Sequence, residues 1–326
     1  EKNFPLSLAF ICIFIPYIYE ESIYAFYETI CSDYECFAPV QSWLLEQANF
    51  PIIIIDEFIK VKMEGLKIKE NEKNINDDET KLNKERKMQK AINLMKIISV
   101  CLNSKILCKE FNSYKFIEVL NDDWSFLKEP DPLLDELWVT ISKIYTKRTA
   151  PLMQGIFQNA IELMTESYTT IRPFRIGVIE LISKMILIDK DLRPYIISYH
   201  IEETVLRLLI QFPGHSFLQN ALLSLCKNAL EIPDMRFIFS KALISPLINK
   251  SKEEFDGKFF MEFTCQLIQK ALDIGQNNKK FLNSIKEMVG FNGFFNDIMK
   301  KRCKLIKNGY GGMLPYFKAR SIAYEY

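Results

Sequence analysis

Glycine is scarce in this chain, which has 11 glycines among 326 residues where the usual share is about 7%. Sandwiches, barrels and Rossmann-type sheets need many turns with positive φ, which glycine adopts most readily. The shortage therefore argues against these folds. The remaining composition, with 48% hydrophobic and 25% charged residues, is that of a folded protein and argues against disorder.

The chain also lacks an excess of charge of either sign. Its 42 Lys and Arg residues almost cancel its 41 Asp and Glu residues, which leaves a net charge of +1. A near-neutral protein has no bulk electrostatic reason to bind nucleic acid or an anionic membrane, so we expect neither as a partner. Only two histidines, His200 and His215, are present for acid–base catalysis or metal binding.

Sequence signatures of enzymes are missing as well. The chain contains no G-x-S-x-G, no P-loop, no H-E-x-x-H and no glycine fingerprint of a dinucleotide-binding fold. We therefore expect no catalytic residues, no cofactor, no metal and no small-molecule substrate. A helical enzyme with a ligand or metal in a cleft around His200 or His215 remains an alternative.

Eight cysteines are present, but none of them forms a Cys-x-x-Cys pair. A chain of this length can bury a core without disulfides. Scattered cysteines in apolar stretches are typical of reduced core residues, so we expect a cytoplasmic protein that can also be nuclear. Cys31 and Cys36 form an isolated C-x4-C, for which metal binding is the weaker interpretation.

Phe4 to Tyr19 is the longest apolar run, and Pro5 and Pro16 interrupt it. It is roughly 16 residues long, whereas a membrane-spanning helix needs about 20. A buried helix is the preferred interpretation, and a membrane or targeting segment is the alternative.

Apolar residues at helical spacing are abundant. Phe174, Val178 and Leu181 lie on one face of a predicted helix that Pro173 opens. Similar stripes occur in residues 91–102, 134–144, 205–212, 218–229, 260–271 and 281–289. Ser216 and Gln219 have the spacing of a capping box at the start of one of these helices. No stretch alternates convincingly as a strand.

Successive helices with broad apolar faces predict an all-α protein built as an armadillo/HEAT-like helical-repeat solenoid, because chain breakers recur roughly every 40 residues. A compact helical bundle is the alternative. We expect N-terminal helices in residues 1–66, a helical-repeat domain in residues 91–308 and a C-terminal tail in residues 309–326. Residues 67–90 are too polar to form a core, so they are predicted to be a flexible charged insertion.

Three groups of segments between Met88 and Asn308 carry a resemblance to a known family. They are residues 91–120 with Trp124-Ser125-Phe126-Leu127 and Pro132-Leu133-Leu134, residues 175–182 with 206–212 and 216–220, and residues 257–274 with 291–308. Their order and pattern resemble the SAPS-domain family, the regulatory subunits of type-6 Ser/Thr protein phosphatases. The chain departs from the family at Gly214, His215 and Ser216, where a tryptophan and paired asparagines are expected.

The resemblance implies a non-catalytic scaffold that binds a type-6-like phosphatase catalytic subunit and directs its substrate choice. It points to partner contacts at the turn of residues 212–220 and at two nearby arginines. The candidate contact residues are Arg172, Arg175, Phe212, His215, Phe217 and Asn220. A helical-repeat adaptor for another pathway, such as transport or cytoskeletal assembly, is the alternative function.

Overall fold

The computed structural model describes residues 12–63, 78–124, 126–253 and 257–307. Within these ranges the chain forms helices joined by turns, without any strand, which confirms the all-α prediction. The chain divides into two compact units, Glu1–Tyr199 and His200–Tyr326. The division falls inside the predicted repeat domain of residues 91–308, and the predicted tail of residues 309–326 lies outside the described residues.

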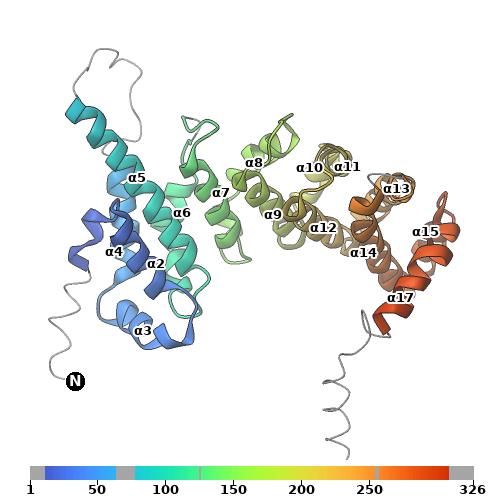
Figure 1. Ribbon diagram of the computed structural model, residues 1–326, viewed down its shortest axis with the longest axis horizontal. Coiled ribbons are helices and arrows are strands. Elements are labelled where there is room, and N and C mark those ends of the chain that lie inside the picture. The colour runs from blue at the N-terminus through green and yellow to red at the C-terminus, as the bar shows by residue number, and fades with distance from the viewer. Residues whose placement is uncertain (1–11, 64–77, 125, 254–256, 308–326) are drawn as a thin grey trace, which may run out of the picture. The chain divides into compact units, whose positions relative to one another are not determined.

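The first unit contains the helices of the N-terminal half of the chain. They are η1 (Ile15–Tyr17), α2 (Glu21–Cys31), η2 (Glu35–Phe37), α3 (Ala38–Glu46), α4 (Phe50–Val61), α5 (Asp78–Cys101), η4 (Cys108–Asn112), α6 (Tyr114–Leu120), α7 (Pro132–Ile144), η5 (Ala150–Leu152), α8 (Ile156–Thr165), α9 (Pro173–Ile188) and α10 (Arg193–Ser198). Helix α5 packs against α2, α4 and α7, and α9 packs against α7 and α8 (Figure 1). Each helix therefore buries its apolar side mainly on helices that are near it in sequence.

Helix α9 is buried on several of its faces. Pro173 occupies its first turn as predicted, and the Phe174 amide donates to the Asp135 carboxylate of α7 (3.2 Å). The predicted stripe is fully buried, but so are Ile179 and Ser183 on other faces. Two flanking helices, α7 and α8, cover α9 from different sides, so its burial is broader than a single stripe.

The predicted flexible insertion of residues 67–90 is wrong for its second half. Helix α5 begins at Asp78 and continues to Cys101, so residues 78–90 are helical. Lys90 forms an ion pair with Glu57 of α4, and Arg86 lies over the ring of Tyr19 (5.6 Å). These contacts to other segments stabilise a helical start that has no apolar stripe of its own. Residues 67–77 lie outside the described residues.

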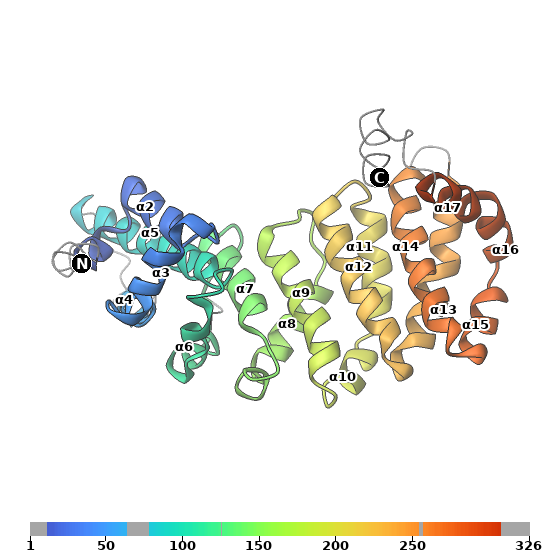
Figure 2. The same cartoon turned by 90° about the horizontal axis from the view of Figure 1, so that it is seen from below.

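The second unit contains the remaining helices. They are α11 (Ile201–Gln211), α12 (Ser216–Glu231), α13 (Pro233–Lys250), α14 (Gly257–Gln276), α15 (Lys279–Lys286), α16 (Phe291–Phe294), η6 (Phe295–Met299) and α17 (Lys300–Lys307). Figure 2 shows α12, α13 and α14 alongside one another, and all three pairs are in contact. The predicted stripe residues Val205, Leu208 and Leu209 of α11 are completely buried, which confirms the helical periodicity there.

The described cysteines are free, and Cys31, Cys101, Cys226 and Cys265 are buried. Burial raises the pKa of the Cys226 thiol, so this thiol stays protonated and unreactive. Of the N-terminal apolar run, only residues 12–19 are described, and Ile15 and Ile18 are buried there. Among the described helices, none is both long and apolar enough to cross a membrane.

Candidate functional site

The predicted contact turn joins α11 to α12 in the second unit. His215 is the N-cap of α12, and its Nδ1 accepts a hydrogen bond from the amide of Leu218 (3.2 Å). The predicted capping box of Ser216 and Gln219 is therefore wrong by one residue. Gln219 instead donates through Nε2 to the carbonyl oxygens of Pro213 and of Phe259 on α14 (3.2 Å for Phe259). These hydrogen bonds fix the turn to α12 and to α14.

This turn presents aromatic side chains to solvent. Phe217 is 71% exposed, and its ring lies edge-on to the imidazole of His215, with 6.5 Å between centroids. Phe259 at the start of α14 is also exposed, and Gly214 approaches its ring. Asn220 is exposed, whereas Phe212 is half-buried. A large apolar ring on a fixed turn is the kind of residue that dominates protein interfaces.

The two predicted contact arginines belong to the first unit and are engaged by its own groups. Arg172 pairs with Asp135 of α7. Arg175 is only 5% exposed, donates to the Leu163 carbonyl (2.7 Å) and pairs with Glu129 and, at 3.5 Å, Glu166. Arg175 therefore joins the helices of its own unit and does not present its guanidinium to a partner, contrary to the prediction.

The guanidinium of Arg175 is also covered by aromatic rings. It lies 3.8 Å from the centroid of Tyr168 and 4.8 Å from that of Phe174. Cation–π contacts of this kind stabilise a desolvated cation by up to about 2 kcal/mol. The carboxylates and the rings together offset the desolvation cost of this cation, which explains why a charged residue lies in the core.

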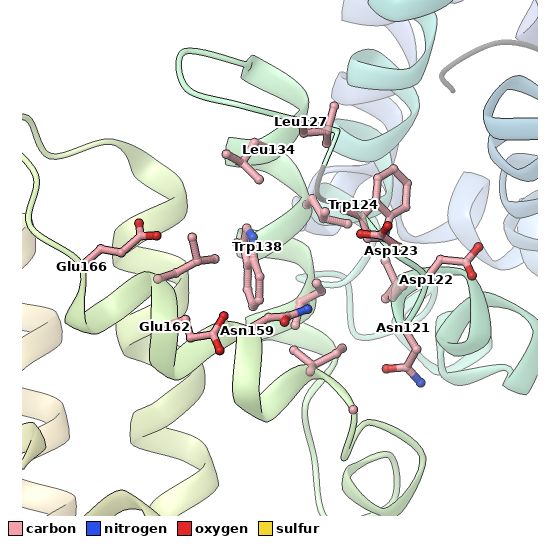
Figure 3. A pocket seen from close by; sticks show the side chains of 16 residues that line it. Asn121, Asp122, Asp123, Trp124, Leu127, Leu134, Trp138, Asn159, Glu162 and Glu166 are labelled. Carbon is pink, nitrogen blue, oxygen red and sulfur yellow. The ribbon is translucent and has the colours of Figure 1, made fainter. Parts of the chain in front are cut away.

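A second candidate site, which the sequence analysis missed, is a cavity of about 240 Å³ in the first unit. We call it the acidic hollow; it lies between the loop after α6, helix α7 and helix α8 (Figure 3). Helix α7 supplies a stripe at i, i+3, i+4 and i+7, namely Leu134, Leu137, Trp138 and Ile141. These side chains make an apolar wall.

Helix α8 faces the same hollow with a different stripe. Asn159, Glu162 and Leu163 share one face of α8, and Glu166, the C-cap residue, continues the i, i+3, i+4, i+7 spacing. Like charges four residues apart, as in Glu162 and Glu166, destabilise a helix slightly. The pattern was visible in the sequence, but nothing in it indicated that this polar stripe faces an apolar one across a cavity.

The loop after α6 closes the hollow with two further carboxylates, Asp122 and Asp123, and with Trp124. Figure 3 shows these aspartates on one side of Trp138 and the two glutamates on the other. The described residues that line the hollow thus include four carboxylates but no lysine, arginine or histidine. The hollow is apolar along its wall and negative around it.

Two cations from outside the hollow neutralise part of this charge. Lys62 pairs with Asp122 and lies 4.4 Å from the ring centroid of Trp124, and Arg175 lies 3.5 Å from Glu166. No ion pair involves Glu162 within the described part of the chain, and its carboxylate accepts a hydrogen bond from the neutral amide of Gln158 (2.7 Å). Negative charge therefore remains at the α8 side of the hollow.

Trp124 is positioned firmly beside the hollow. Its ring stacks on that of Phe58 in α4, with 6.1 Å between centroids. Its indole Nε1 is buried without a hydrogen-bond partner in the described structure. A buried donor without a partner lowers the stability of the folded state by about 1–3 kcal/mol, so the indole N–H of Trp124 is unfavourable where it lies.

Three side chains at the start of α11 place possible metal-ligand atoms near one another. One ligand atom from each of His200, Glu202 and Glu203 lies within 4.8 Å of the others. The Glu202 side chain is buried, and its Oε2 has no hydrogen-bond partner among the described residues. The glutamates occupy the first turn of the helix, where carboxylates complement the positive end of the dipole. His200 alone of the two histidines thus meets convergent carboxylates.

Two ionisable groups on α7 have shifted pKa values. Burial raises the pKa of the Glu136 carboxyl, although Lys96 and Lys143 oppose this shift. Burial lowers the pKa of the Lys143 ammonium, which donates to the carbonyl (2.9 Å) and hydroxyl (2.7 Å) oxygens of Ser99. Lys143 thus joins α7 to α5, and neither group lines the acidic hollow.

Comparisons of the chain with protein families, with curated proteins and with solved structures find no match.

Proposed function

We propose that this chain is a non-catalytic helical-repeat scaffold of the armadillo/HEAT kind, which binds a type-6-like Ser/Thr phosphatase catalytic subunit and directs its substrate choice. The all-α architecture, in which helices pack on near neighbours in sequence, supports a repeat scaffold. The segments that resemble the SAPS-domain family support the phosphatase as partner.

The observation that carries this proposal is the exposed aromatic turn of residues 212–220. Phe217 is largely exposed although its neighbour Leu218 is completely buried. The cap at His215 and the hydrogen bonds of Gln219 hold the turn in one conformation. An interface residue that is already held in place loses little conformational freedom on binding, so a single aromatic anchor contributes more to affinity.

The test is capture of purified type-6 phosphatase catalytic subunit by the full chain, measured by surface plasmon resonance. We expect saturable binding that Phe217→Ala weakens by at least about tenfold, the loss of one hot-spot side chain. Val289→Ala is the matched control, because Val289 is an equally exposed apolar residue (75%) of the same unit. Absence of binding, or equal losses in the two variants, would contradict the proposal.

The alternative is a helical-repeat adaptor for another pathway, such as transport or cytoskeletal assembly. It has the same architecture and would use the same exposed turn, so only the identity of the partner separates the two functions. A stoichiometric partner other than a phosphatase, whose binding is sensitive to Phe217→Ala, would favour the adaptor.

A further inference from the structure

We propose that the acidic hollow of the first unit binds a lysine or arginine side chain, flanked by apolar residues, on an extended segment of a partner protein. The inference rests on the proposed function only in taking a protein as the partner. It concerns a surface separate from the turn of residues 212–220 and assigns it a ligand chemistry.

The charge of the hollow selects a cation. Its lining includes four carboxylates and no basic residue. Lys62 and Arg175 pair with Asp122 and Glu166, which leaves Glu162 without an ion pair in the described structure. A cationic group that enters between the α8 face and the loop after α6 meets carboxylates on both sides (Figure 3).

The wall of the hollow selects a long organic cation over a metal ion. Hard metal ions take six or more oxygen ligands that converge on one point. The carboxylates of the hollow do not converge in this way, since the one described group with three mutually close acidic or histidine donors is at His200. Lysine and arginine instead have apolar stems that pack on apolar surface while the charged head reaches polar groups.

Trp138 lies between the two acidic sides of the hollow (Figure 3). Indole rings attract ammonium and guanidinium groups, so this residue favours the same occupant as the carboxylates do. A second indole ring, that of Trp124, also lines the hollow.

The size of the hollow limits the occupant. Its volume of about 240 Å³ is below the range of about 300–1,000 Å³ that is usual for sites of drug-sized ligands or cofactors. One long side chain with part of an apolar neighbour suits such a volume. The remainder of the segment would lie across the rim.

The test uses the full chain and heptapeptides of sequence acetyl-Gly-Ala-Leu-X-Leu-Ala-Gly-amide, in which X is Arg, Lys, Gln or Glu. Two of the three tryptophans line the hollow, so tryptophan fluorescence reports binding directly. We expect a saturable change with the Arg and Lys peptides, at a Kd at least about tenfold below that of the Gln peptide. Added salt should weaken this binding.

Glu162→Gln should weaken the preference for Arg over Gln, because it removes the carboxylate of the hollow that has no ion pair in the described structure. Glu118→Gln is the matched control, because it makes the same charge change at an exposed site of α6 that does not line the hollow. Equal binding of the Arg and Gln peptides, an unchanged preference in Glu162→Gln, or no saturable change with any peptide would each overturn the inference. Phosphatase capture is measured separately, so peptide binding without capture rejects only the proposed function.

Discussion

Gly177 allows α9 to lie close against the backbone of α7, and replacing it tests this packing directly. A Cβ at this position would lie 2.9 Å from the carbonyl carbon and oxygen of Trp138 and from the amide nitrogen of Val139. Ordinary van der Waals contact begins near 3.5 Å, so α7 and α9 would have to separate by roughly 0.6 Å. Backbone atoms cannot rotate aside, unlike the end of a flexible side chain.

The magnitude follows from two opposing terms. Overpacking a close interface costs about 1–3 kcal/mol, and the rigid backbone favours the upper end. Alanine gains about 1 kcal/mol over glycine inside a helix. Gly177→Ala should therefore destabilise the first unit by about 2 kcal/mol. For a unit of this size, this corresponds to a decrease in Tm of about 4–8 °C.

Tryptophan fluorescence during thermal unfolding is the assay, because Trp43, Trp124 and Trp138 all lie in the first unit. Gly155→Ala is the control, since a Cβ there meets no atom within 4 Å. Alanine at this helix N-cap costs some stability relative to glycine, but it also restricts the unfolded chain, and the two effects on the free energy of unfolding roughly cancel. If Gly177→Ala melts at or above the wild-type temperature while the control is unchanged, the close approach of α7 and α9 is refuted.

Three further predictions concern burial and charge. Leu208→Asp places a charge at a completely buried position, so it should destabilise the second unit by several kcal/mol in urea unfolding followed by circular dichroism. Ile210→Asp, on the exposed face of the same helix, should be tolerated. Equal effects of the two substitutions would show that the stripe is misassigned. Arg175→Ala should cost about 2 kcal/mol in tryptophan-monitored unfolding, because it removes a buried guanidinium that donates to the Leu163 carbonyl and packs on the Tyr168 ring. A loss no larger than that of the exposed Arg148→Ala would argue against these buried contacts. Burial raises the pKa of Glu136 in the folded state, so ionisation of this carboxyl costs stability as the pH rises above about 4.3, the pKa of glutamate in the unfolded chain. Glu136→Gln should therefore raise Tm at pH 7 and lose that advantage below about pH 4. An equal gain in Tm at both pH values would exclude ionisation as the cause.

Parts of the candidate sites could be predicted from local sequence, and parts could not. The turn of residues 212–220 is placed correctly between the predicted helical stripes 205–212 and 218–229, but its cap is assigned to Ser216 instead of His215. An imidazole is an unusual cap, and only its position relative to the Leu218 amide reveals the role. The resemblance points to Arg175 as a partner contact, whereas the structure buries this residue. Its burial depends on Glu129, Tyr168 and Glu166, which reach it from separate segments.

The acidic hollow could likewise be predicted only in part from the sequence. Each of its stripes follows a helical period that can be counted in the sequence, and Glu162 and Glu166 are visibly on one face. Which face of α8 lies opposite the α7 stripe depends on how both helices pack on α9. That choice is a property of three helices together, so no single segment encodes it in a form that periodicity can reveal.

The sequence by itself determined the all-α class, the helix start at Pro173, and the buried stripes of α9 and α11. These features depend on a period of 3.6 residues and on the backbone limits of proline, which act over one or two turns. The tertiary structure alone decided that residues 78–90 are helical, that Arg175 is internal and that separated carboxylates surround one cavity. These features depend on contacts between residues far apart in the chain, whose free energy exists only once the helices have packed.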